Sequence, residues 1–220
     1  MDNKRLLFSE ELDRVRHNIL AMSSMVEEGL GKALAAFQNN DRELAEAVRD
    51  ADDAVDRMQL AIEDETVVLI ATQQPVARDL REIFTILKIT ANLERAGDHA
   101  VHLAKTAIKL SGKASFRAME HLELMVQTGQ EMIRASVSAY LKQDSAAARE
   151  AAALDAISDG EHKKLSEEML TLMKAHPELL KKALRFLHTS GDLERLGDHI
   201  TNICEAIIYM IESRHEELNE

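Results

Sequence analysis

Two pairs of acidic residues have the chemistry and the spacing to hold a cation. Glu94 and Asp98 are four positions apart, and so are Glu194 and Asp198. On a helix, side chains four positions apart lie on one face, one turn from each other. Both pairs fall in a lane of otherwise apolar or small residues. Because a half-buried carboxylate needs a cation, a hydrogen-bond donor or a proton, this placement favours a bound cation.

A second acidic pair lies upstream of each of these. Asp52 and Asp56 precede the first pair, Asp155 and Asp159 precede the second, and their spacing is again four. Two antiparallel helices that each present such a pair can build a site with four carboxylates. Oxygen-rich sites of this kind suit hard cations or bridged iron and manganese.

One further residue beyond each downstream pair could complete a ligand set. His102 lies four positions beyond Asp98 and could add a nitrogen, and Asn202 lies four beyond Asp198 and could add a carbonyl oxygen. The two sites therefore need not prefer the same metal ion. The predicted metal ligands are Asp52, Asp56, Glu94, Asp98 and His102 in the first half of the chain, and Asp155, Asp159, Glu194, Asp198 and Asn202 in the second.

The same acidic residues also allow a purely structural interpretation. Arg57, Arg95 and Arg195 could neutralise them in a network of salt bridges. His99 and His199 are adjacent to the acids in sequence but point to a helix face about 100° away. For these two histidines a capping or interface role is favoured over metal ligation.

The two halves of the chain repeat one pattern. Leu-Glu-Arg-Ala-Gly-Asp-His at 93–99 returns as Leu-Glu-Arg-Leu-Gly-Asp-His at 193–199, with six of the seven residues identical. Duplication of one unit is the simplest account. The repeated glycines, Gly97 and Gly197, fall inside expected helices, where glycine costs about 1 kcal/mol relative to alanine. That cost, present twice, indicates close approach of another helix or of an ion.

The spacing of apolar residues predicts the helices that position these side chains. Apolar residues recur every three or four positions, and aromatic residues make up only 3% of the chain, which argues against strands. Helices are expected over about 12–37, 41–72 and 75–110, and after a linker at 111–115 three more end near 142, 175 and 215. The tail at 216–220 is expected to fray. The predicted class is all-α, with two tandem antiparallel three-helix bundles related by internal duplication, at 1–112 and 113–220.

Composition argues against several classes of function. The net charge of −12 repels nucleic-acid backbones, and no more than two basic residues are adjacent. The apolar run at 67–71 is too short for membrane insertion. The N-terminus lacks the apolar core of a signal peptide, and the single cysteine, Cys204, fits a buried thiol in a reducing compartment. A cytoplasmic location is therefore expected.

Motifs of known enzyme chemistry are largely missing from the sequence. There is no Gly-rich phosphate loop and no nucleophile elbow. The Glu-x-x-His spacing of di-iron carboxylate bundles occurs only at Glu212 and His215, near the expected end of the last helix. The protein is therefore predicted not to be an enzyme. A metal-dependent hydrolase or oxidase that uses the carboxylate clusters remains the main alternative, and a purely structural helical scaffold is a third.

Several stretches resemble the PhoU family, the phosphate-uptake regulators of bacteria and archaea. They are Gln-Pro-Val-Ala-Arg-Asp-Leu-Arg at 74–81, Asn-Leu-Glu-Arg-Ala-Gly-Asp-His-Ala at 92–100 and Asp-Leu-Glu-Arg-Leu-Gly-Asp-His-Ile at 192–200. The spacing of Asp52 and Asp56 fits as well. The resemblance covers essentially the whole chain. The second half departs from the first, because it lacks the stretch Pro-Val-Ala-Arg-Asp-Leu-Arg and has Pro-Glu-Leu-Leu-Lys-Lys at 177–182 instead.

The resemblance implies a fold, a role and a set of partners. Such proteins form two three-helix bundles side by side and carry acidic motifs that hold iron in some members and other ions, such as zinc or manganese, elsewhere. They act as negative regulators of high-affinity phosphate import and of phosphate-starvation signalling. The implied partners are components of the phosphate ABC transporter and a sensor histidine kinase. Dimers or larger assemblies are expected.

Overall fold

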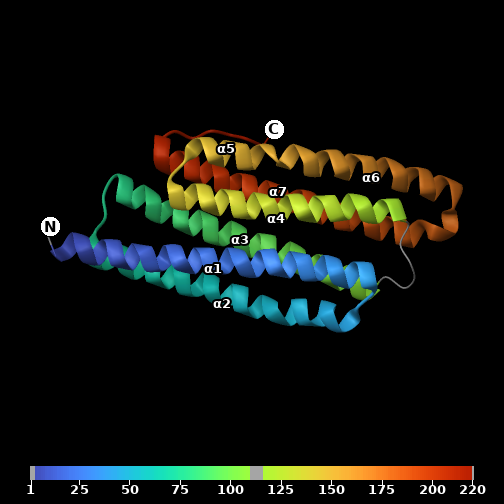
Figure 1. Ribbon diagram of the computed structural model, residues 1–220, viewed down its shortest axis with the longest axis horizontal. Helices are drawn as coiled ribbons and strands as arrows, with labels where there is room; N and C mark the ends of the chain where they lie inside the picture. The colour runs from blue at the N-terminus through green and yellow to red at the C-terminus, as the bar shows by residue number, and fades with distance from the viewer. Residues whose placement is uncertain (1–2, 110–115, 220) are drawn as a thin grey trace.

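The structure is a pair of elongated helical bundles lying side by side (Figure 1). This computed structural model describes residues 3–109 and 116–219, and no strand occurs within them. The first unit contains α1 (Asn3–Asn39), α2 (Arg42–Gln73) and α3 (Arg78–Lys109). The second contains α4 (Phe116–Lys142), α5 (Ser145–Ala153), α6 (Asp155–Ala175), a 3₁₀ turn (Pro177–Leu179) and α7 (Leu180–Glu212). The predicted all-α class with two antiparallel three-helix units is confirmed. The expected linker at 111–115 and the expected boundary after residue 112 lie outside the described residues.

Equivalent aspartates start the second helix of each unit. The Asp41 carboxylate accepts a hydrogen bond from the backbone N–H of Leu44 at 3.0 Å, before α2. The Asp144 carboxylate accepts hydrogen bonds from the N–H groups of Ala146 and Ala147, both at 3.0 Å, before α5. Each cap satisfies donors that the first turn of a helix leaves unpaired, which is worth about 1 kcal/mol. The same local signal thus fixes where the acidic second helices begin.

The core runs through both units and across the contact between them. The last helices of the two units, α3 and α7, pack on each other, and α1 packs on α4. Leu93 and Leu193, the equivalent residues of the repeated motif, are both buried. Thr85 of α3 donates its hydroxyl to the backbone carbonyl of Ala206 in α7 at 3.0 Å, within this buried contact. The two units therefore share one hydrophobic interior, and the acidic motifs lie on the helices that join them.

Two helix starts differ from the sequence prediction. The third helix was expected from Pro75 but begins at Arg78, because Ala77 adopts a left-handed φ of 49° that an α-helix does not accommodate. Pro177 was expected to open the last helix, but it opens a 3₁₀ turn, and α7 follows from Leu180. In both cases the proline sits in the connection, where its missing N–H is harmless.

The expected helix between residues 145 and 175 is interrupted. It breaks at Leu154, whose N–H bonds the carbonyl of Ala151, three residues back, at 3.3 Å. Such a tighter turn replaces the regular four-residue spacing at one point. The break immediately precedes Asp155, one of the predicted ligands.

The C-terminal segment up to Asn219 lies against the second unit, so the prediction of a frayed tail is wrong for residues 216–219; residue 220 lies outside the described residues. The last helix ends at Glu212 rather than near His215, because Ser213 has a left-handed φ of 58°. The N–H of Leu218 then donates to the Glu205 carboxylate at 2.8 Å, and Leu218 packs against the core. This hydrogen bond and the apolar contact offset the entropy of ordering the tail.

Candidate metal centres

The four predicted carboxylates of the second unit line one pocket. Asp155 and Asp159 come from α6, and Glu194 and Asp198 from α7. The pocket also contains Thr201 and is closed on one side by Leu218 and Asn219 of the folded-back tail. The structure therefore brings this predicted set together across two packed helices.

Asp155 is the most buried acid of this second-unit cluster. Its residue is 9% exposed, and its Oδ1 atom is buried without a hydrogen-bond partner among the described residues. The Thr201 hydroxyl donates to the other oxygen at 3.5 Å. Burial, followed by the charges of Asp159, Asp198 and Glu194, raises the pKa of Asp155 to about 7. A carboxylate so placed is half-protonated near neutral pH unless a cation joins it.

Gly197 makes room for Asp155. A Cβ atom built on Gly197 would overlap Oδ1 of Asp155 and lie 2.9 Å from its Cγ. Any side chain other than hydrogen would therefore push the carboxylate away from α7. The close approach that the mid-helix glycines predicted is confirmed for Gly197. At Gly97 a Cβ would meet Val55 at 3.5 Å, an ordinary contact.

The second-unit cluster also contains a nitrogen donor that was not predicted from the sequence. His162 of α6 lines the same pocket, and its Nδ1 lies 3.0 Å from the Ser190 hydroxyl. Burial, followed by Asp198, raises the pKa of Glu194, while His162 acts in the opposite direction. The spacing of Asp155, Asp159 and His162, four and then three, is the signal that would have indicated this residue. Asn202, the predicted fifth ligand, is exposed and is not among the residues that line the pocket.

The first-unit cluster is more open. Burial and the charges of Asp56 and Asp98 raise the pKa of Asp52, and burial and Asp98 raise that of Glu94. The four predicted acids of α2 and α3 are thus electrostatically coupled. Asp56 and its counterpart Asp159 are both exposed, but Asp52 is only half-buried, whereas its counterpart Asp155 is buried. This unit therefore presents a shallower acidic surface than the second.

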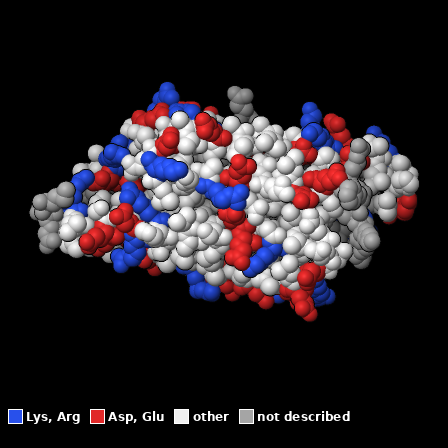
Figure 2. All heavy atoms as spheres, viewed as in Figure 1, with Lys and Arg blue, Asp and Glu red and all other residues white. Residues whose placement is uncertain are grey.

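The salt-bridge interpretation is met only in part. Arg95 lies 3.7 Å from both Glu94 and Asp98, but its side chain is 63% exposed, so these contacts are weak. Arg195 pairs with Asp192 at 2.8 Å rather than with the downstream acids of its own unit. On the face shown in Figure 2, acidic and basic side chains are interspersed over the surface.

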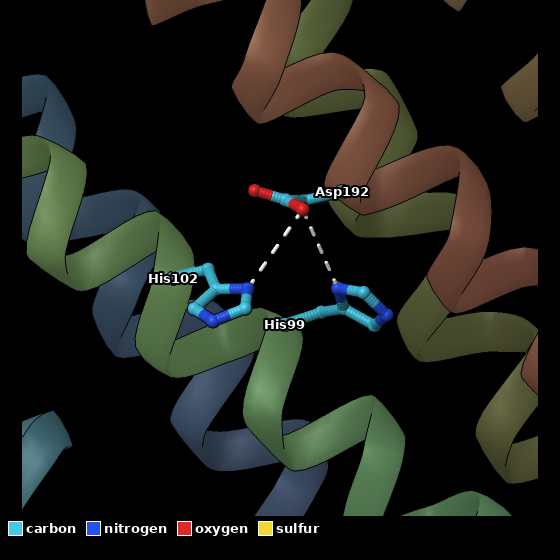
Figure 3. A group of neighbouring side chains, drawn as sticks. All are labelled: His99, His102 and Asp192. Carbon is cyan, nitrogen blue, oxygen red and sulfur yellow. Dashed lines mark ion pairs between the residues drawn. The ribbon is translucent and has the colours of Figure 1, made fainter.

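The predicted ligand His102 contacts a different acid from the one expected. Its Nδ1 lies 3.7 Å from Asp192 Oδ1 of α7, and Nδ1 of His99 lies 3.8 Å from the same oxygen (Figure 3). His102 therefore lies with residues of the contact between the two units. His99 is at this contact too, as the interface interpretation of the histidines predicted. Burial lowers the pKa of His99 to about 4, so its ring is neutral at pH 7.

The donor atoms of both clusters fit hard cations, and the second-unit cluster fits them better than the first-unit cluster. Carboxylate, hydroxyl and amide oxygens suit magnesium, manganese or iron, and a histidine broadens the choice toward zinc. In the second-unit cluster, the orphaned Asp155 oxygen and the cradle at Gly197 are features that a bound cation would explain. In the first-unit cluster, Asp52, Asp56, Glu94 and Asp98 would hold a cation with more of its coordination left to water.

These features define a duplicated helical-bundle protein with an acidic cluster on each unit. The PhoU domain model matches residues 19–107 and 122–207, one match in each unit. The chain belongs to the PhoU family. None of the described helices combines the length and the apolar character needed to cross a membrane.

Curated relatives and solved structures cover nearly the whole chain. The Clostridium acetobutylicum protein named phosphate-specific transport system accessory protein PhoU homolog is 36% identical, over 98% of this chain and 99% of its own. The Escherichia coli K12 accessory protein PhoU is 31% identical over 94% and 86%. The crystal structure of PhoU from Pseudomonas aeruginosa, 34% identical, superposes with a TM-score of 0.89 over 94% of this chain and all of that one. The Streptococcus pneumoniae regulatory protein PhoU, 30% identical, gives 0.88 over 96% and 99%.

Proposed function

We propose that this protein is a regulatory accessory protein of phosphate-specific transport. It acts as a negative regulator of high-affinity phosphate import and of phosphate-starvation signalling. In this role it is a cytoplasmic adaptor between the phosphate ABC transporter and a sensor histidine kinase, and it works as a homodimer or a larger assembly. The observation that carries the proposal is the end-to-end match, across both units, to relatives named accessory proteins of this transport system.

The surface of the first unit supports a binding role. Large apolar side chains are exposed where α2 passes into α3: Val67 is 61% exposed, Val68 57% and Val76 73%. Phe84, two turns into α3, is 46% exposed. Exposed apolar groups gathered at one end of a monomer are characteristic of protein-binding surfaces. The stretch at 74–81, which the second unit lacks, lies at this end, and we assign the partner contact to it.

The carboxylate clusters have a supporting part in this proposal. Divalent cations such as iron, manganese or zinc bind them, neutralise the coupled acids and hold the second and third helices of each unit in a fixed geometry. The two units, at 1–112 and 113–220, are not equivalent, because the second cluster is the deeper and carries His162. The protein performs no catalytic turnover in this scheme.

A deletion strain tests the proposal. We expect loss of the gene to raise phosphate uptake and the expression of a phosphate-starvation reporter in phosphate-replete medium, and the wild-type gene to restore both. Val76→Asp, which places a charge on the proposed partner surface without touching the core, should fail to restore them. Val68→Ala, a mild change on the same surface, serves as the matched control.

The deletion strain, together with assays on the purified protein and on acid-to-amide variants, separates the alternatives. If uptake and reporter expression stay unchanged in the deletion strain, the regulatory proposal is wrong. If the purified protein instead hydrolyses phosphate esters or consumes dioxygen, and Asp98→Asn abolishes that turnover, the metal-dependent hydrolase or oxidase replaces it. If all acid-to-amide variants complement fully, the clusters serve the scaffold alone.

A further inference from the structure

Three potential ligands converge at the contact between the two units. His99 and His102 of α3, three positions apart on one face, point toward Asp192 of α7 (Figure 3). One ligand atom from each residue lies within 4.8 Å of the other two. Among residues 3–109 and 116–219, no other group of three or more histidine, cysteine and acidic residues meets this distance criterion. The carboxylate clusters are more widely spread.

The distances fit a shared cation better than hydrogen bonds. Nδ1 of His99 and Nδ1 of His102 lie 3.8 and 3.7 Å from Asp192 Oδ1. A hydrogen bond between a ring nitrogen and a carboxylate would bring them to about 2.7–3.2 Å. Two ligands that each bind a tetrahedral cation at about 2.0–2.1 Å stand roughly 3.3 Å apart. The three side chains are thus aimed at a common point with room for an ion between them.

His99 adds a second, independent observation. The residue is 8% exposed, and its Nδ1, the atom that faces Asp192, is buried without a hydrogen-bond partner among the described residues. Leaving such an atom unpaired costs about 1–3 kcal/mol. A cation at this point would satisfy the orphaned nitrogen.

The internal duplication supplies a natural comparison. The positions equivalent to Asp192, His99 and His102 are Asn92, His199 and Asn202, at the common offset of 100. There His199 Nδ1 lies 3.0 Å from Asn92 Oδ1, which is a normal hydrogen bond. Two amides therefore stand where the other copy has a carboxylate and a second imidazole. One copy pairs its half-buried histidine, His199, with an amide, and the other leaves the buried ring of His99 unpaired beside metal-ligand side chains.

We propose that His99, His102 and Asp192 form a third cation site, between the two units, for zinc or another borderline divalent transition ion. Two imidazoles and one carboxylate are the donor set of open zinc sites, with the fourth position left to water. The His102 side chain is 50% exposed, so the site opens to solvent on that side. Arg195 contacts Asp192 Oδ1 at 2.8 Å, but its exposed side chain can move aside when the ion binds.

The site would link the two units. Two of its ligands belong to α3 and the third to α7, so a bound ion joins the last helices of the two bundles directly. The carboxylate clusters, in contrast, each lie within one unit. Zinc at this position therefore stiffens the contact between the units, whatever ions the clusters hold and whether or not the protein regulates phosphate uptake.

Zinc titration of the full-length protein tests this inference. Calorimetry is carried out with zinc against apo protein in a large excess of magnesium, which occupies oxygen-only sites. We expect His102→Asn and Asp192→Asn, each of which installs the residue of the other copy, to lose one equivalent of bound zinc. Asn202→Ala and Asn92→Ala, at the equivalent positions of the other copy, should keep this equivalent of zinc. His162→Asn should keep it as well, which would distinguish this site from the second-unit cluster.

A measurement on the wild-type protein keeps the test independent of folding. Zinc should shift the imidazole NMR signals of His99 and His102. The proposal is overturned if these two signals do not move at one equivalent of zinc. It is equally overturned if folded His102→Asn, with its thermal midpoint in chelator unchanged, binds as many equivalents as wild type.

Discussion

The carboxylate of Asp155 lies against the backbone of Gly197, in space that any Cβ atom would fill. Asp155 is the most buried acid of the second-unit cluster, and Gly197 is the glycine of the repeated motif. The glycine therefore has a specific purpose: it lets an acid from α6 reach the surface of α7. This relationship makes the Gly197 position the most sensitive test of how the cluster is built.

Gly197→Ala should displace Asp155 and destabilise the protein. Overpacking of a closely fitted contact costs about 1–3 kcal/mol, more than the roughly 1 kcal/mol that alanine gains over glycine in a helix. Chemical denaturation measures the change. Gly160→Ala is the matched control, because a Cβ at Gly160 of α6 meets nothing within 4 Å. That control should be neutral or stabilising. Equal behaviour of the two variants would contradict the close contact.

The raised pKa of Asp155 predicts a pH-dependent stability in the absence of divalent ions. The folded protein holds this proton up to about pH 7, because the pKa of Asp155 is raised there, whereas the unfolded chain releases it near the ordinary aspartate pKa of 3.8. Between these values the folded state binds more protons, so its stability falls as the pH rises. Asp155→Asn removes this contribution. We expect the stability difference between variant and wild type to grow in the variant's favour from pH 4 to pH 7, on the order of 1–3 kcal/mol.

Cation binding should show the opposite trend. Because a proton and a cation compete for Asp155, the affinity of the second-unit cluster for manganese should rise between pH 5 and pH 8. Manganese should therefore stabilise the wild type more at pH 8 than at pH 5, as measured by thermal midpoint. An equal shift at both pH values would show that Asp155 takes no part.

The sequence determined the helices and the repeat more fully than the sites. The period of the apolar residues and the caps at Asp41 and Asp144 located the helices, because these signals are local. The break at Leu154 changes the hydrogen-bond spacing at a single residue, which the apolar pattern does not reveal. The docked tail at Leu218 was missed because it depends on a tertiary contact with Glu205 of α7. Periodicity cannot show such contacts.

The acidic pairs were identifiable because the offset of four on one helix face is a local property. The contact of His99 and His102 with Asp192 was not, because it depends on how α3 packs against α7. The sequence placed His102 one turn beyond Asp98 and assigned it to the same cluster. In the structure the packing of the two units gives it a different partner.

A buried ion pair between α1 and α3 should contribute substantially to stability. Glu82, which is 4% exposed, accepts a hydrogen bond from Arg16 Nε at 2.9 Å, and the Tyr140 hydroxyl of α4 lies 3.4 Å from the same oxygen. Glu82→Gln removes the buried counter-charge of Arg16, leaves it only the exposed Asp13 at 2.8 Å, and should cost about 2–4 kcal/mol in urea denaturation. Glu46→Gln, which breaks the exposed pair with Arg42, should cost less than about 0.5 kcal/mol. A similar cost for both would mean that burial adds nothing to the Glu82 interaction.

The difference in depth between the two clusters predicts different cation retention. We compare Glu94→Gln/Asp98→Asn with Glu194→Gln/Asp198→Asn, and measure the metal content of untagged protein by mass spectrometry after dialysis. The second-unit variant should lose more bound metal, because its wild-type cluster is the deeper and includes the orphaned Asp155 oxygen and His162. Zinc held by His99, His102 and Asp192 should survive in both variants. Equal losses would show that burial does not set retention, and an unchanged content in both would assign the acids to a metal-free surface.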